Sequence, residues 1–465
     1  MFKTIFKKEL IDQLISPKFL IVFLLCLILI PPSLVMNYKN YRNNLFEYEY
    51  LKRDYSERKK IVNLPLTAHR EPSILSTFGI GLERVLPKVI IFKKYHTETQ
   101  ATQAEHELLS NITGKMDFVL IVSFLLGLFA ILYASALIVG EKETGTLKLV
   151  LSNKTKRSAF LFGKYMAGYI VLVIPLFISF LISILFLVFS GFPLFSANNF
   201  SHILVLLILS LIYLSTFFAL GLFVSTRSQK TSVAFMLSFL IWILLAVVVP
   251  KISEPLANII HPIQSDEVRM MKRRQVRDQI ELEKGAKLAP LAQKYIWGRE
   301  GVRDFNKYRE ERAPIASEFE GRIERSLQEL DAQSQKEKDF NVNLSLLIAR
   351  LSPSLIYTHS SLNFCKTGLA DRENFFRNLM TYHNQLSTVY FKNTYDDIIV
   401  SEDGKSKSHI SGHSSSVSDI PEFQYEFLSL GETLKSSLPD ILLLILYNLI
   451  LFSAAYFSFV RYDVR

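Results

Sequence analysis

Six segments of the chain contain no Asp, Glu, Lys or Arg, and each is at least 18 residues long. About 20 apolar residues in a helix, at about 1.5 Å rise per residue, cross a hydrocarbon core about 30 Å thick. The pattern therefore predicts an all-α integral membrane protein with six transmembrane helices. We place them at residues 19–36, 118–139, 165–190, 203–224, 232–249 and 441–460.

The distribution of charge assigns the polar segments to the two sides of the membrane. With the N-terminus inside, the inner segments are residues 1–18, 140–164, 225–231 and 461–465, which hold 14 Lys and Arg against 5 Asp and Glu. They therefore carry +9 of the net charge of +10. Because short cytoplasmic loops are enriched in Lys and Arg, both termini are expected in the cytoplasm. The basic excess then indicates orientation and contact with anionic lipid headgroups, so nucleic acid is not an expected partner.

The first inner segment, residues 1–18, has the pattern of an amphipathic helix. Apolar residues recur at spacings of three and four, with charged residues elsewhere on the wheel, which is typical of a helix at the membrane interface. Its characteristic residues include Phe2, Phe6, Lys7, Lys8 and Leu10. We expect this helix to break at Ser16-Pro17, and Pro31-Pro32 to mark the outer end of the first span.

Two larger segments are expected outside the membrane. Residues 37–117 form the first, with a helix over 98–110. Residues 250–440 form a larger, mainly helical domain. Its charge-dense first part predicts a long helical hairpin, interrupted near Pro290 and Pro314, and the serine-rich stretch 401–419 predicts a mobile loop. The hairpin carries an apolar stripe at Phe319, Ile323, Leu327 and Leu330.

The most informative inner segment, residues 140–164, opens with Gly140-Glu141-Lys142-Glu143-Thr144-Gly145-Thr146-Leu147. Thr144 or Thr146 can cap a short helix, and Gly145 allows a partner's backbone to approach closely. Such a helix would lie across the membrane surface and present charged residues to a cytosolic partner. From these residues alone, an ordinary positive-inside loop with acids for solubility is an equal alternative.

A resemblance decides between these alternatives. The opening pattern, the basic cluster Ser152-Asn153-Lys154-Thr155-Lys156-Arg157 and the pair Gly163-Lys164 resemble the permease subunits of type 2 ABC exporters. The first helix looks like their interfacial elbow helix. The turn Ser225-Thr226-Arg227-Ser228-Gln229-Lys230, with Trp242 and Pro250 bounding the fifth span, is similar to their second inner loop. A branch of the family carries a large insertion before the last span, which Leu351-Ser352-Pro353-Ser354 and Pro421-Glu422-Phe423 resemble.

The resemblance implies a membrane-spanning permease that works with two separate ATPase subunits, which would bind ATP and Mg, and with a second permease, identical or homologous. It also implies a multi-pass protein of the plasma (inner) membrane, of bacterial origin, whose outer domain could bind a further protein. Coupling to the ATPase is assigned in this way to Glu141, Lys142, Glu143, Thr144, Gly145, Thr146 and Leu147, and in the second loop to Arg227, Gln229 and Lys230.

The sequence also excludes several kinds of chemistry. No G-x-x-x-x-G-K-[ST] motif is present, so we expect no phosphate-binding loop and no catalytic residue in this chain. The uncharged spans argue against an ion-coupled carrier. Cys26 and Cys365 fall on opposite sides of a membrane boundary, and His409 and His413 lie in the serine-rich loop, so we expect no metal site and no bound cofactor.

The polar groups of the spans indicate how polar a transported substrate can be. A hydrophilic solute would need polar groups to replace its hydration, and the spans offer mainly hydroxyls. These include Tyr133, Ser135, Ser179, Ser183, Ser215 and Thr216. We therefore expect export of an amphiphilic or lipid-linked substrate, or mechanical motion of the outer domain. The alternative is a membrane-anchored receptor or scaffold whose outer domain binds a partner, but a scaffold has no need for the 141–147 pattern.

Overall fold

The computed structural model describes residues 2–59, 66–92, 97–99, 116–152, 156–194, 196–296, 304–389, 398–400, 406–408 and 423–462. Over these residues the chain is almost entirely helical, which confirms the predicted all-α fold. Its contacts divide it into two compact units. Met1–Val248 with Ser352–Arg465 is called the membrane unit here, and Val249–Leu351 the hairpin unit.

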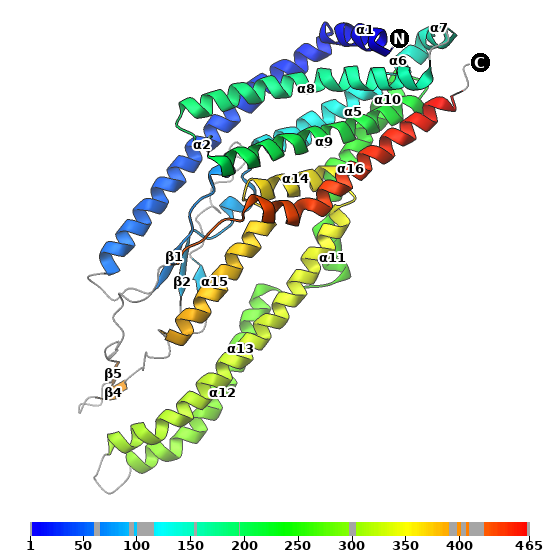
Figure 1. The fold of residues 1–465 in the computed structure, drawn as a ribbon. Helices are drawn as coiled ribbons and strands as arrows, with labels where there is room; N and C mark the ends of the chain where they lie inside the picture. Colours follow the sequence, from blue (N-terminus) through cyan, green and yellow to red (C-terminus); the bar gives the residue numbers. More distant parts are fainter. Residues whose placement is uncertain are drawn as a thin grey trace. The chain divides into compact units, whose positions relative to one another are not determined.

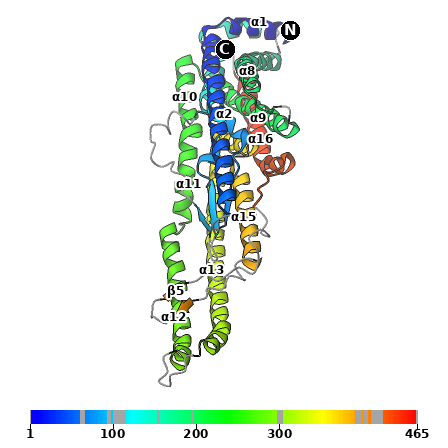
Figure 2. The same cartoon turned by 90° about the vertical axis from the view of Figure 1, so that its left-hand side faces the viewer.

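The membrane unit begins with α1 (Phe2–Leu14) and α2 (Pro17–Lys59), and the chain breaks between them at Ser16-Pro17 as predicted. The helix does not stop at Pro31-Pro32, however, and Figure 2 shows α2 as one long rod. Four large side chains on one face of α2 are buried on both sides of the two prolines: Ile30, Leu34, Tyr38 and Tyr41. This packing, much of it against α8 (Arg157–Phe189), stabilises the helix where two backbone donors are missing. The end of the membrane crossing at the prolines stays a prediction.

Six helices among the described residues are long and apolar enough to cross a membrane, and they coincide with the six predicted spans. The second span passes from α4 (Phe118–Leu120) through a π-helical segment, η3 (Ile121–Leu126), into α5 (Gly127–Ser135). The others are α2, α8, α9 (Ala197–Arg227), α10 (Thr231–Ile243) with its π-helical extension η4 (Leu244–Val248), and α16 (Leu430–Val460) (Figure 1). The helix α1 and the final turn of α16 lie at the same end of the membrane unit (Figure 1).

Close helix packing in this unit depends on glycine. A Cβ atom at Gly221 of α9 would lie 2.2 Å from the carbonyl oxygen of Ile131 in α5. A Cβ at Gly127 of α5 would lie 2.4 Å from the hydroxyl of Tyr213 in α9. Small residues let the backbones of membrane helices approach, and dispersion and hydrogen bonding then hold them together.

The end of the membrane unit far from α1 contains the only three-stranded sheet of the described residues, formed by β1 (Thr67–His69), β2 (Val89–Phe92) and β3 (Thr97–Thr99). Ile90 and Phe92 of β2 pack on Phe375 and Leu379 of α15 (Leu369–Val389). The helix predicted over 98–110 is wrong at its start, because Glu98 pairs with Ile91 in the sheet. Pairing with β2 overrides the local helical pattern, and 100–110 lie outside the described residues.

A second pair of strands, β4 (Ile398–Val400) and β5 (Ser406–Ser408), is antiparallel. The strand β5 falls within the stretch predicted to be a mobile loop, 401–419. The remainder of that stretch, with His409 and His413, lies outside the described residues.

The predicted outer domain 250–440 is divided between the two units. Its later part belongs to the membrane unit, where α14 (Pro353–Phe364) packs between α9 and α16 (Figure 1). The ring of Tyr357 stacks on that of Tyr213 at 4.5 Å, and its hydroxyl lies 2.9 Å from the Ser210 hydroxyl. On the α16 side, Nδ1 of His359 lies 2.8 Å from Oδ2 of Asp440.

The hairpin unit contains α11 (Val249–Ile260), α12 (Asp266–Tyr295) and α13 (Phe305–Ala349). The predicted hairpin is present, but neither Pro290 nor Pro314 interrupts it. Both prolines are exposed, so the carbonyls that lose a backbone partner are open to water. The predicted stripe forms the core of the hairpin: Phe319, Ile323 and Leu327 are buried against Ile280, whereas Leu330 is half-buried.

The close contact of α5 and α9 at Gly221 predicts how a larger residue there changes the stability of the protein. We expect Gly221→Ala to lower the free energy of unfolding by about 1 to 3 kcal/mol, because the new methyl group forces the helices apart. Gly431→Ala is the matched control, since a Cβ there has no atom within 4 Å. Thermal unfolding of the purified protein measures both. Equal midpoints for the two variants would contradict the close approach.

Candidate coupling site

The site begins where the second span ends. After α5 the chain makes a turn and forms two short helices, α6 (Val139–Glu143) and α7 (Thr146–Ser152). Gly145 separates them with φ of +74°, a left-handed conformation that favours glycine. The Thr144 hydroxyl donates to the Gly140 carbonyl at 3.0 Å, and the Thr146 hydroxyl lies 3.0 Å from that of Thr144. The threonines therefore close the end of α6 instead of capping the start of α7.

Glu141 points into the protein, where it meets a buried lysine. Nζ of Lys164 in α8 lies 2.8 Å from Oε1 of Glu141 and 2.9 Å from Oε2 of Glu9 in α1. Lys164 is only 3% exposed. The amide of Gln13 donates to the other oxygen of Glu9 and accepts from the Tyr133 hydroxyl at 3.3 Å. One cation thus links the elbow helix α1, the third span and α6.

Lys142 interacts with the end of the fourth span. Its Nζ donates to the backbone carbonyls of Thr226 and Ser228, the latter at 3.2 Å. These carbonyls belong to the C-terminal end of α9, which carries partial negative charge, so a lysine is stabilising there. The same ammonium group lies 4.5 Å from the centre of the Tyr462 ring, just after α16.

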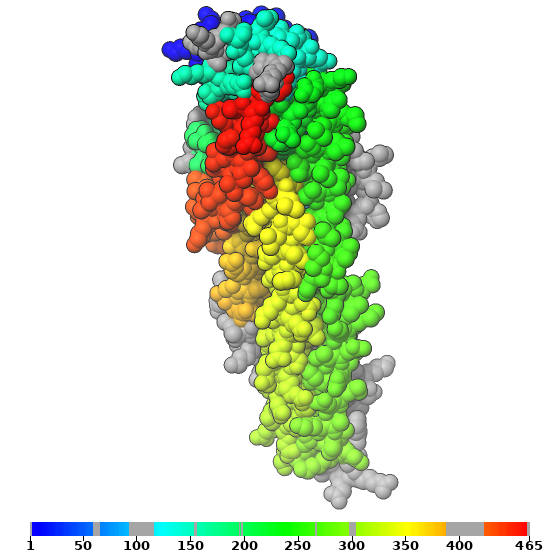
Figure 3. Space-filling model, turned by 90° about the vertical axis from the view of Figure 1, so that its right-hand side faces the viewer, coloured from blue at the N-terminus to red at the C-terminus, as the bar shows by residue number. Residues whose placement is uncertain are grey.

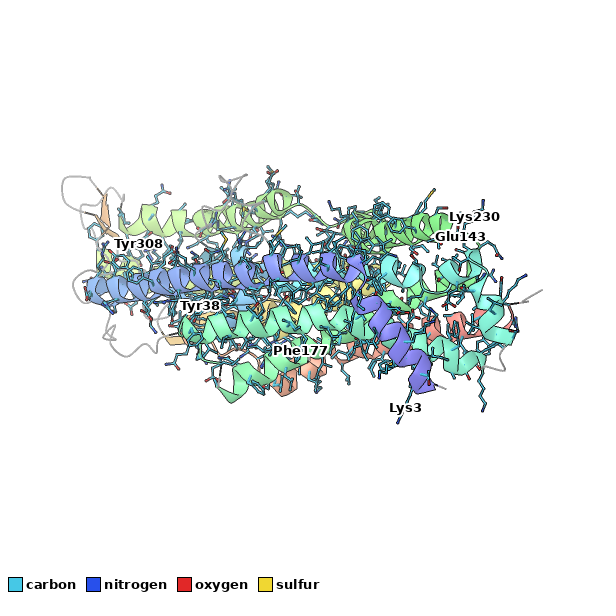
Figure 4. The ribbon with its side chains drawn as sticks, turned by 90° about the horizontal axis from the view of Figure 1, so that it is seen from above. Lys3, Tyr38, Glu143, Phe177, Lys230 and Tyr308 are labelled. Atoms are coloured by element: carbon cyan, nitrogen blue, oxygen red, sulfur yellow. The ribbon has the colours of Figure 1, made fainter. Side chains whose placement is uncertain are left out.

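Glu143 interacts with the start of the fifth span. Its Oε2 accepts from the backbone N–H of Thr231 at 2.9 Å and from the Thr231 hydroxyl. A carboxylate at a helix N-terminus satisfies free backbone donors and complements the helix dipole. Figure 4 shows Glu143 beside Lys230 at this end of α10. The loop between α9 and α10 is therefore held between Lys142 and Glu143.

Arg157, the last residue of the basic cluster, contacts the end of the last span. The guanidinium of Arg157, at the start of α8, donates to the carbonyl of Val460 and to that of Tyr462 at 3.1 Å. Since Val460 is the last residue of α16, this arginine caps the C-terminal end of that helix.

Several of the predicted coupling residues face outward. Thr144, Gly145 and Thr146 are exposed, whereas Leu147 is buried. In α7 the side chain of Leu149 protrudes and is 69% exposed. The second-loop residues Arg227, Gln229 and Lys230 are also exposed. In the elbow helix, Lys7 and Lys8 are exposed, Phe6 and Leu10 are half-buried, and Phe2 packs on Phe162 of α8 at 5.8 Å between ring centres.

The sequence-based assignment missed two residues. Lys164 was noted as the start of the third span, but its role as the shared partner of two carboxylates was not seen. A lysine at the start of an apolar span is usually taken as a positive-inside residue, which gives no sign of burial. The exposure of Leu149 could not be predicted either, because a leucine in a short loop carries no motif.

The arrangement is that of a six-span membrane protein whose loops at one end are hydrogen-bonded to each other and expose a short helix, α7. A family model described as "ABC-2 family transporter protein" matches residues 3–464, so the chain belongs to the ABC-2 transporter family. It is thus a permease subunit of an ABC transporter, a multi-pass membrane protein that associates with ABC ATPase subunits. No curated protein matches the chain.

The buried lysine makes a prediction for this site. We expect Lys164→Met to lower the free energy of unfolding by up to about 3 kcal/mol, because Glu9 and Glu141 then face each other without a cation. Thermal unfolding in detergent measures the loss. The variant that also carries Glu9→Gln and Glu141→Gln removes both carboxylates and should recover most of it. A single variant as stable as the wild type would show that the three charges do not depend on one another.

Proposed function

We propose that this permease couples ATP hydrolysis on its ATPase partner to export through α7 and the second inner loop. The observation that best supports this proposal is the exposure of Leu149. This leucine is 69% exposed on α7, a helix of seven residues that follows the second span. An exposed apolar side chain beside exposed charges is a suitable anchor for a groove on a partner. Exposed Arg227, Gln229 and Lys230 extend the docking surface.

The internal contacts of α6 support a lever mechanism. A force on α7 would pass through Gly145 to α6, whose three charged residues are bonded to α8, to the end of α9 and to the start of α10. Lys164 of α8 extends this set of contacts to Glu9 of α1. Buried ion pairs and charged contacts with helix ends resist separation, so these elements move together. Glu141 and Glu143 would then transmit motion within the permease, and the partner would contact mainly α7.

The polar groups of the spans support an amphiphilic or lipid-linked substrate, or mechanical motion without transport. Several of their hydroxyls are bonded within the helix bundle: that of Ser183 donates to the carbonyl of Ser179, and that of Ser215 lies 2.6 Å from both the Tyr165 hydroxyl and Nδ2 of Asn448. Among the described residues, the hydroxyls of Ser179 and Ser238 are buried without such a partner. Hydroxyls that bond neighbouring helices are not free to replace the hydration of a polar solute.

The complete transporter in this proposal has two ATPase subunits, which bind ATP and Mg, and a second permease. It lies in the inner membrane of a bacterium, with both termini in the cytoplasm and the hairpin unit outside, where a further protein could bind it. The short inner loops, with their excess of Lys and Arg, support this orientation.

The docking surface is tested by Leu149→Glu. We expect at least about a tenfold weaker association with the ATPase subunit, equivalent to about 1.4 kcal/mol, because a carboxylate would enter an apolar contact. Copurification and stimulated ATP hydrolysis measure this effect. Leu149→Met is the matched control and should behave as the wild type. If Leu149→Glu copurifies normally and stimulates hydrolysis normally, the ATPase docks elsewhere.

The orientation is tested by labelling introduced cysteines in intact cells with a membrane-impermeant maleimide. We expect Glu281→Cys in α12 to react and Ser152→Cys at the end of α7 to react only after the cells are opened. The wild type supplies the background, because Cys26 and Cys365 are both buried. The reverse pattern would overturn the orientation and, with it, the assignment of α7 to the cytoplasm.

A further inference from the structure

The residues just after the sixth span contact two elements of the candidate coupling site. The helix α16 ends at Val460, and Tyr462 follows it with a half-buried side chain that packs on the core of the membrane unit. The carbonyl of Tyr462 accepts from Arg157 of α8 at 3.1 Å, and the centre of its ring lies 4.5 Å from Nζ of Lys142 in α6. Figure 3 shows the red end of α16 bordering the blue-green segment that holds α6 and α7.

The surroundings of Lys142 explain why an aromatic ring suits this position. An ammonium group has three N–H donors, and the carbonyls of Ser225, Thr226 and Ser228 accept from that of Lys142. Its positive charge then attracts the electron-rich face of a ring, and this attraction is stronger where the two groups are shielded from water. Lys142 therefore joins the end of α9 to the end of α16 through one charge, as Lys164 joins α1 to α6.

The helix α16 is suited to carry motion along its length. Between Asp440 and Val460 it contains neither proline nor glycine, the residues that most often kink a helix, and this part is about 30 Å long. At its far end Oδ2 of Asp440 lies 2.8 Å from Nδ1 of His359 in α14. A straight helix that is bonded near both ends moves as one body, so a displacement at its C-terminal end would reach α14.

We propose that Tyr462 is a positioning residue for coupling, through which motion of α6 reaches the sixth span. The proposed function carries this motion from α6 to the third, fourth and fifth spans by way of Glu141, Lys142 and Glu143. The contact between Lys142 and the Tyr462 ring adds the sixth span to the same lever. The proposal rests on the proposed role of α6 as a lever and is independent of where the ATPase subunit docks.

The test changes the ring and leaves α7 intact. Tyr462→Leu removes the face of the ring, whereas Tyr462→Phe retains it. Phe457→Leu is the matched control, because this ring of α16 is 61% exposed. In the full-length permease purified with its ATPase subunit, we expect stimulated ATP hydrolysis to fall about threefold to tenfold in Tyr462→Leu. The other two variants should hydrolyse ATP as the wild type does, and the ATPase subunit should copurify with all three.

A second measurement follows the sixth span itself. Spin labels at Asn43→Cys on α2 and Leu442→Cys on α16 report the distance between these two helices, and both positions are exposed. The native Cys26 and Cys365 are buried and give little background. We expect the change in this distance on addition of a non-hydrolysable ATP analogue to fall at least about threefold in Tyr462→Leu and to persist in Tyr462→Phe.

A double-mutant cycle separates transmission from simple packing. If Tyr462 acts through Lys142, Tyr462→Leu lowers stimulated hydrolysis in the wild type but adds no further loss in Lys142→Met. The same proportional loss in both backgrounds, a lowered thermal midpoint of Tyr462→Leu, or wild-type hydrolysis and motion in that variant would overturn the proposal. Failure of the docking surface is recognised separately, because Leu149→Glu would then copurify normally while the results at Tyr462 would stand.

Discussion

Three consecutive charged residues at the end of the second span hold together the end of the membrane unit at which α1 lies. Glu141 pairs with Lys164, Lys142 bonds the carbonyls that end α9, and Glu143 bonds the amide that begins α10. Each side chain leaves α6 in a different direction, so a helix of five residues is bonded to three others, α8, α9 and α10. The signs are fixed by the partners, because a helix C-terminus favours a cation and a helix N-terminus an anion. An exchange of Lys142 with Glu143 would place both charges against dipoles of the wrong sign.

The apolar pattern of the chain was sufficient to predict the spans, because a membrane helix must satisfy its own backbone and remain apolar over a fixed length. The same pattern also predicted the packed stripe of the hairpin. It failed where tertiary contacts override a local signal. Pro31-Pro32 lie within α2, where buried residues continue along the helix on both sides, and the end of the crossing at the prolines stays a prediction. Glu98 lies in a strand because β2 supplies a partner for it.

In the candidate coupling site, too, some features could be predicted from the sequence and others could not. The turn at Gly145 follows from its composition, since a left-handed backbone conformation favours glycine. The partners of Glu141 and Glu143 cannot be predicted from the loop sequence, because Lys164 and Thr231 are brought close only by the packing of α8 and α10. Both carboxylates were assigned by resemblance to a contact with another subunit, whereas the structure gives each a partner within the chain. Contacts of this kind depend on distances between helices, which a loop sequence does not contain.

The membrane unit also determines how motion can reach the hairpin unit. The chain leaves the membrane unit after η4 and re-enters it at Ser352. The Ser352 hydroxyl donates to the carbonyl of Leu245 in η4, so the point of exit and the point of return are hydrogen-bonded to each other. From Ser352 the chain enters α14, which is bonded to α9 through Tyr357 and to α16 through His359. A displacement of the fourth or sixth span therefore acts on both ends of the membrane unit's chain at η4 and Ser352 at once.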